Sequence, residues 1–141
     1  MTQRLDLPML TDFAQQLRLA GLRPTRQRVA IAALLLDGRH RHVSADSLIE
    51  EITAAGLQVS SGTVYNTLNQ FTDAGLLRRV VVHNEYSLFD TNTDNHHHFY
   101  EASNDQLVDI PSDDVILAKL PQTPDGHKVT AVDVIIHIQS K

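Results

Sequence analysis

The sequence contains no cysteine among its 141 residues. Disulfide bridges, thiolate zinc sites, iron–sulfur clusters and cysteine nucleophiles are therefore all excluded. Any metal site in this protein must instead use the nitrogen atoms of histidine and the oxygen atoms of carboxylates.

The sequence also lacks any apolar run that approaches the length of a membrane span, and its N-terminus lacks a secretory pattern. The hydrophobic fraction of 42% is ordinary for a globular protein. A chain of this length forms one domain or two small ones. We therefore expect a cytoplasmic protein that has no membrane partner.

Lysine is absent from residues 1–82, where nine arginines stand against seven acidic residues and give a net charge of +2. Residues 83–141 hold three lysines against ten acidic residues, a net charge of −7, together with six of the eight histidines. A basic half joined to an acidic, histidine-rich half indicates polyanion binding coupled to cation binding. The alternative is that the charges are segregated by chance.

Apolar periodicity and capping residues predict four helices in the first 75 residues. The first covers residues 8–20, and Thr25, Ser44 and Ser60 are the predicted N-caps of the next three. Ser60 follows only four residues after Gly56, where the third helix ends. A turn this short between two helices predicts a helix-turn-helix.

The fourth helix carries no charged side chain before Asp73, although exposed helices are usually rich in Glu and Lys. Its outward face is predicted to hold uncharged polar side chains, namely Thr63, Tyr65, Asn66, Asn69 and Gln70. Such groups suit hydrogen bonding and methyl contact at base edges in a DNA major groove. The alternative is an ordinary surface helix.

Two strands are predicted after this helix, at residues 76–82 and 86–89, with a turn between them. A helix-turn-helix followed by a β-hairpin wing is a winged helix. The polar, loop-like residues 90–95 are the best candidate for a domain boundary. We therefore predict that residues 1–90 form a winged-helix DNA-binding domain.

Residues 91–141 are predicted to contain strands at 96–102, 106–110 and 129–138, and a short helix from Ser112 through Leu120. A unit this small seldom folds alone, and no disulfide can stabilise it, so we expect dimerisation. The predicted fold class is α+β, with an N-terminal winged helix-turn-helix followed by a small α/β dimerisation domain.

Three consecutive histidines, His96, His97 and His98, precede two residues that favour strands. On a strand, His96 and His98 point to one face and His97 to the other. Two imidazoles side by side suit a divalent metal ion. The alternative is a solvated polar loop.

Four segments together resemble the ferric uptake regulator superfamily. They are Gly-Leu-Arg-Pro-Thr-Arg-Gln-Arg at residues 21–28, His-Val-Ser-Ala-Asp at 42–46, Thr-Val-Tyr-Asn-Thr-Leu at 63–68 and His-X-His at 96–98. The resemblance implies a winged helix, a dimerisation domain and a regulatory metal site at the hinge between them. The implied ligands are His42, Asp90, His96, His98 and Asp109. Nitrogen with carboxylate oxygen suits Mn²⁺ or Fe²⁺, and also Zn²⁺.

The sequence departs from that family at a structural zinc site. Most members carry a Cys-X-X-Cys pair where this chain has Glu101 and Asn104, so we expect no structural zinc. The triple histidine without cysteine resembles the iron response regulator subgroup, which implies haem as a regulatory ligand at His96, His97 and His98. The chain has no Cys-Pro haem motif, which excludes a thiolate-ligated haem.

The resemblance also implies how DNA is bound. Thr63 and Tyr65 would meet bases, and Arg23 would enter a narrow, A·T-rich minor groove. Asn66 stands where many members have arginine, and it could pair with adenine. Arg78, near the base of the wing, would contact phosphates.

These implications predict a homodimeric repressor-type regulator that binds A·T-rich operator DNA and is not an enzyme. A hydrolytic metalloenzyme with Glu101 as general base is a second hypothesis, but it leaves the helix-turn-helix unexplained. A haem or metal buffer without a DNA role is a third.

Overall fold

The computed structural model describes the backbone of residues 7–84 and 86–141, with side chains from Asp12 onward. The chain divides into two compact units, one ending at Thr93 and the other beginning at Asp94. We describe each unit by itself. No helix in the described ranges is both long and apolar enough to cross a membrane.

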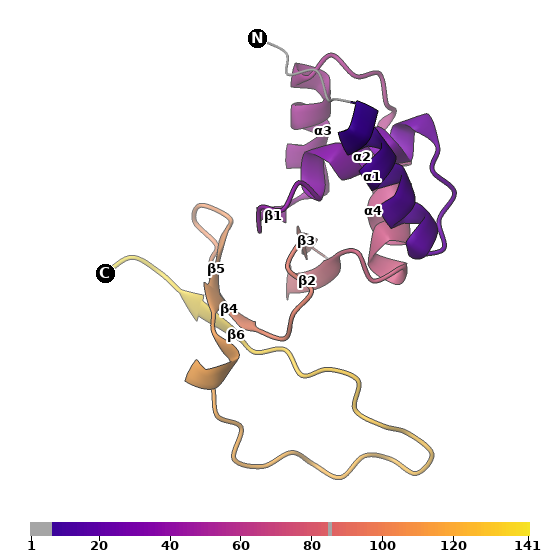
Figure 1. Ribbon diagram of the computed structural model, residues 1–141. Coiled ribbons are helices and arrows are strands. Elements are labelled where there is room, and N and C mark those ends of the chain that lie inside the picture. The colour runs from indigo at the N-terminus through magenta and orange to yellow at the C-terminus, as the bar shows by residue number, and fades with distance from the viewer. Residues whose placement is uncertain (1–6, 85) are drawn as a thin grey trace. The chain divides into compact units, whose positions relative to one another are not determined.

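The described residues of the first unit form four helices, as predicted (Figure 1). They are α1 (Leu7–Leu19), α2 (Arg26–Leu35), α3 (Ala45–Ala54) and α4 (Ser61–Asp73). The predicted N-caps are confirmed, because the side chains of Thr25, Ser44 and Ser60 each accept a hydrogen bond from the backbone N–H three residues later. Their apolar stripes meet in one core, in which Leu17, Leu48 and Leu68 have no exposed surface.

The end of α4 shows why the wing begins later than predicted. The N–H of Gly75 bonds to the carbonyl of Thr72, and the N–H of Leu76 bonds to that of Phe71. This Schellman ending requires Gly75 in the left-handed region, at φ +81°. Residues 76 and 77 therefore complete the helix cap, and the first wing strand starts at Arg78.

The wing strands are β2 (Arg78–His83) and β3 (Tyr86–Asp90), which pair antiparallel. A further strand, β1 (His42–Val43), was not predicted, and it pairs with the other edge of β3. Its register places His42 opposite Asp90. Because only two residues pair, no alternating pattern marks β1 in the sequence.

The second unit contains a sheet in the order β5-β4-β6, formed by β4 (His97–Glu101), β5 (Gln106–Ile110) and β6 (Ile135–Ile138). β5 pairs with β4 antiparallel and β6 pairs with it parallel. β6 is shorter than the predicted strand at 129–138, because only its last residues lie opposite β4.

The predicted helix from Ser112 through Leu120 is wrong beyond its first turn. Ser112–Asp114 form a single 3-10 turn, and residues 115–134 contain no helix or strand. The apolar side chains that suggested the helix stay exposed, Ile116 at 88% and Leu120 at 49%. A helix this short needs tertiary packing on its apolar face, and here Ile116, Leu117 and Leu120 all stay exposed.

Candidate metal centre and nucleic-acid interface

The first donor pair lies inside the first unit, where β1 meets β3. His42 Nε2 lies 3.1 Å from Asp90 Oδ2, and the Asp90 side chain is only 1% exposed. The other carboxylate oxygen, Oδ1, accepts a hydrogen bond of 2.9 Å from the backbone N–H of Asn92. A buried carboxylate held this way beside an imidazole is a ready pair of metal ligands.

The residues around this pair fix its position. The Arg41 guanidinium makes two hydrogen bonds to the Glu51 carboxylate on α3, at 2.9 and 2.6 Å. The backbone N–H of Arg41 donates to Thr91 Oγ1, and the N–H of Thr91 donates to the Arg41 carbonyl. Sequence reasoning missed these three residues, because their roles depend on partners ten and fifty residues away.

The second donor group lies inside the second unit. Asp109 on β5 stands directly opposite His98 on β4. Its Oδ1 atom lies 3.4 Å from the Nε2 atoms of both His96 and His98. The two imidazole rings lie 4.5 Å apart between centroids. Two imidazoles and a carboxylate therefore converge, a donor set that suits Mn²⁺, Fe²⁺ or Zn²⁺.

Hydrogen bonds distinguish the roles of His96 and His97. His96 Nδ1 lies 2.6 Å from the carbonyl oxygen of Asp94, which can only accept, so Nδ1 carries the proton. The lone pair is then on Nε2, on the side of Asp109, as in histidines that ligate metals. His97 Nδ1 instead accepts from the backbone N–H of Val134 at 3.1 Å, which leaves the proton on Nε2.

The three histidines are all buried, with 6%, 5% and 2% of their surfaces exposed, so the solvated-loop alternative is wrong. His96 precedes β4 rather than starting it, yet it still shares Asp109 with His98. Tyr100 follows on the same strand, where burial and then a hydrogen bond to Asp105 raise its pKa.

The predicted DNA-facing side chains lie on the first unit. Tyr65 on α4 is 47% exposed, and Asn66 is exposed beside it. Thr63 is half-buried, and its hydroxyl bonds that of the N-cap Ser60 at 2.9 Å, so it supports the start of the helix. Arg23 is exposed and its carbonyl accepts from Arg28.

Arg78 and Arg79 differ although they are neighbours on β2. Arg78 is half-buried and stands opposite Asp90 in the ladder. Arg79 is exposed and reaches α4, where its Nη2 donates to Asn69 Oδ1 at 2.5 Å. The sequence did not single out Arg79, because only the hairpin geometry turns it toward the helix.

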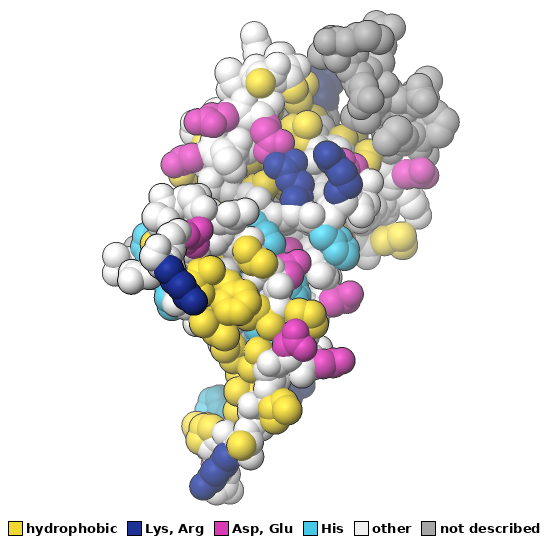
Figure 2. All heavy atoms as spheres, turned by 90° about the vertical axis from the view of Figure 1, so that its left-hand side faces the viewer, with side chains coloured by type: hydrophobic (Ala, Val, Ile, Leu, Met, Phe, Trp, Pro, Cys, Tyr) yellow, Lys and Arg dark blue, Asp and Glu magenta, His cyan; other side chains and the backbone are white. Residues whose placement is uncertain are grey.

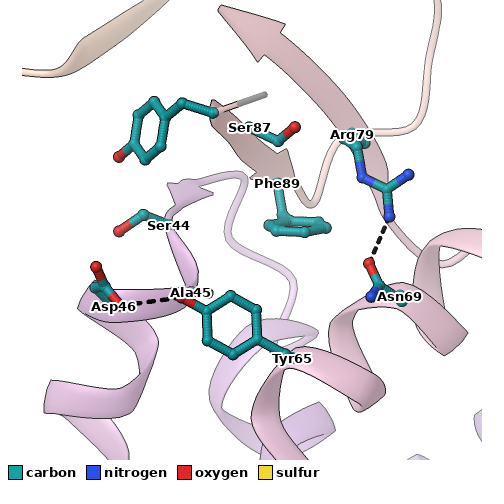
Figure 3. Close-up of a pocket in the computed structure, with 9 residues that line it drawn as sticks. Ser44, Ala45, Asp46, Tyr65, Asn69, Arg79, Ser87 and Phe89 are labelled. Atoms are coloured by element: carbon teal, nitrogen blue, oxygen red, sulfur yellow. Dashed lines mark hydrogen bonds between the residues drawn. The ribbon is translucent and has the colours of Figure 1, made fainter. Parts of the chain in front are cut away.

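A pocket of about 330 Å³ lies between α4, the wing and the start of α3 (Figure 3). Tyr65 and Asp46 face each other across it, and the tyrosine hydroxyl donates to Asp46 Oδ1 at 3.2 Å. This hydrogen bond and the carboxylate charge raise the pKa of Tyr65. The tyrosine is thus oriented while its ring stays accessible.

Comparisons with known proteins agree with one another. A sequence model described as the ferric uptake regulator family matches residues 19–138. The ferric uptake regulation protein of Vibrio parahaemolyticus is 29% identical over 133 residues, covering 94% of this chain and 89% of the relative. The peroxide-responsive repressor PerR of Staphylococcus aureus is 34% identical over 101 residues, covering 72% and 68%.

Solved structures give the same result for the fold. The ferric uptake regulator of Pseudomonas aeruginosa with manganese has a TM-score of 0.69 at 25% identity, covering 90% of this chain and 96% of that one. The regulator of Vibrio cholerae has a TM-score of 0.70 at 23% identity, covering 90% and 98%. The predicted fold class is therefore confirmed.

Proposed function

The chain belongs to the ferric uptake regulator family, and we propose on that premise that it is a homodimeric regulator of iron and haem homeostasis that binds A·T-rich operator DNA. Members of this family are metal-responsive transcription regulators and not enzymes, so the metallohydrolase hypothesis is set aside. In this proposal residues 1–90 read DNA, and residues 91–141 dimerise and sense the signal. Such a protein acts in the cytoplasm, where the operator is.

The proposed metal site joins the two donor groups. His42 and Asp90 would supply ligands from one unit, and His96, His98 and Asp109 from the other, to Mn²⁺ or Fe²⁺, with Zn²⁺ as a further option. Neither group alone offers more than three ligands, whereas a shared ion would receive up to five. The chain from Asp90 to His96 spans at most about 20 Å, so it permits the two groups to meet. This pair of imidazole–carboxylate groups is the observation that carries the proposal.

Dimerisation is supported by an apolar face on the second unit. Val108, Phe99 and Ile136 lie side by side across the three strands, and Val108 and Ile136 are 47% and 40% exposed. Figure 2 shows hydrophobic side chains gathered on one face of this unit. An open apolar sheet face of this kind is typical of a protein interface. We propose that a second copy of the chain covers it.

Haem is the second proposed signal, as in the iron response regulator subgroup, with His96, His97 and His98 as candidate axial ligands. To ligate iron through Nε2, His97 would have to move its proton to Nδ1 and lose its bond from Val134. His96 and His98 would have to leave Asp109. Haem and the divalent metal would therefore oppose each other, and linkage makes that antagonism reciprocal.

The decisive experiment is a gel-shift titration on A·T-rich operator DNA, with metal alone, with haem alone and with both. We expect metal to promote the complex and haem to release it. Binding of DNA that neither ligand changes would contradict the regulatory role. Haem or metal binding without any DNA complex would instead favour the buffer hypothesis.

A further inference from the structure

Asn69 lies one helical turn after Tyr65 and three residues after Asn66, so all three share the outward face of α4. It is exposed and lines the same pocket as Tyr65. If α4 reads DNA, as proposed above, Asn69 lies within reach of a base edge. The inference below therefore rests on the proposed function.

Arg79 is held in place from two sides. Its cross-strand neighbour is Phe89, and its guanidinium carbon lies 5.6 Å from the centre of the Phe89 ring, a cation–π contact. Its Nη2 atom donates to Asn69 Oδ1 at 2.5 Å. Figure 3 shows the amide oxygen of Asn69 turned toward this guanidinium. The wing thus fixes which end of the Asn69 amide faces the arginine.

We propose that Arg79 and Asn69 form a specificity-determining pair that presents only hydrogen-bond donors to one base pair. An asparagine free at both ends of its amide reads adenine, because its oxygen accepts from the N6 amino group and its nitrogen donates to N7. Here the oxygen is bound to a cation, and an approaching amino group would meet positive charge. The amide N–H₂ of Asn69 and the remaining guanidinium N–H groups of Arg79 are donors only, and both residues are exposed.

Donors alone favour bases that offer acceptors in the major groove. Guanine presents two acceptors, O6 and N7, and thymine presents the acceptor O4 with no amino group. Adenine has its N7 acceptor beside an amino group, and cytosine presents only an amino group. The pair should therefore select guanine or thymine. Asn66 has no comparable arginine contact among the described side chains, so it remains able to pair with adenine. Two asparagines one turn apart would then read different bases.

The test is selection from a randomised operator library, followed by competition binding, with wild type, Arg79→Met, Asn69→Ala and the control Arg78→Met. Met keeps an unbranched apolar stem against Phe89 but removes the donors. We expect Arg79→Met and Asn69→Ala to lose about three- to tenfold discrimination at the same base pair, the range that one hydrogen bond supports. Arg78→Met should weaken binding evenly across sequences.

Three results separate the hypotheses. Arg79→Met could weaken the affinity for all DNA sequences equally and leave the base preference unchanged. That result would refute the specificity-determining pair and show that Arg79 contacts a phosphate. A wild-type protein without any sequence preference would overturn the proposed function instead. The side-chain amide of Asn69, followed by NMR without DNA, tests the pair itself. The chemical shift of the side-chain carbonyl carbon should change in Arg79→Met and stay the same in Arg78→Met. An unchanged chemical shift in Arg79→Met would refute the inference.

Discussion

Asp109→Asn should weaken metal binding strongly, with little change in the stability of the metal-free protein. The side chain is 42% exposed and contacts Nε2 of both His96 and His98. Its replacement therefore leaves no buried cavity, and a change of this kind at the surface alters the free energy of unfolding by only about 0.5 kcal/mol or less. The carboxylate charge, however, is lost from the centre of the donor group.

The size of the effect follows from linkage. Loss of an outer-shell partner already weakens metal binding by about 10–100-fold, so loss of a direct ligand should cost about 100-fold. At a metal concentration 100 times the wild-type Kd, binding stabilises the folded protein by about 2.7 kcal/mol. The variant, then at a concentration equal to its Kd, gains about 0.4 kcal/mol. The difference corresponds to about 5–9 °C in Tm for a chain of this size.

The assay is thermal unfolding in chelator and in Mn²⁺ at about 100 times the wild-type Kd, followed by circular dichroism. Asp114→Asn is the matched control. Asp114 is an exposed acidic residue of the same unit, and it lies outside the donor group. We expect the control to keep the full metal-induced rise in Tm. If Asp109→Asn keeps it as well, Asp109 is not a ligand and the proposed site is wrong.

Three further predictions address DNA, fold and the tyrosine. Tyr65→Ala should weaken specific operator binding by about 1–3 kcal/mol in fluorescence anisotropy, and wild-type affinity would refute the assignment of the recognition helix. Strong chelation should leave the protein folded and dimeric by circular dichroism and sedimentation, because no thiolate zinc holds the fold; dissociation into monomers would contradict this. Asp46→Asn should lower the raised pKa of Tyr65 toward its ordinary value in an alkaline absorbance titration, since the carboxylate stabilises the neutral phenol. An unchanged titration curve would show that Asp46 does not perturb this tyrosine.

The elements that follow local rules were predictable from sequence. Thr25, Ser44 and Ser60 cap their helices because the hydroxyl and the bonded N–H are three residues apart. The strand at 106–110 was also predicted with its observed limits, Gln106–Ile110. In each case the signal and the structure lie within the same few residues.

The features that the sequence missed depend on distant partners. β1 exists only because β3 offers it an edge, and Arg41 gains its role from Glu51 and Thr91. The helix predicted through Leu120 is wrong for a different reason. Its apolar residues have helical spacing, but their side chains stay exposed in the structure. Long-range pairing and missing packing partners leave no local trace in the sequence.

The two-residue strand β1 connects His42 to the start of α3, and through Asp46 to Tyr65, over very few residues. Val43 ends the strand, Ser44 begins the capping box of α3, and Asp46 in the first turn holds the Tyr65 hydroxyl. Both ends of the stretch from His42 to Asp46 are held in place. The pairing of β1 with β3 holds its first residues, and the reciprocal Ser44–Ser47 hydrogen bonds hold the start of α3. A displacement of the His42 imidazole would therefore be transmitted directly to Asp46 in the first turn of α3, and so to the Tyr65 hydroxyl that Asp46 holds.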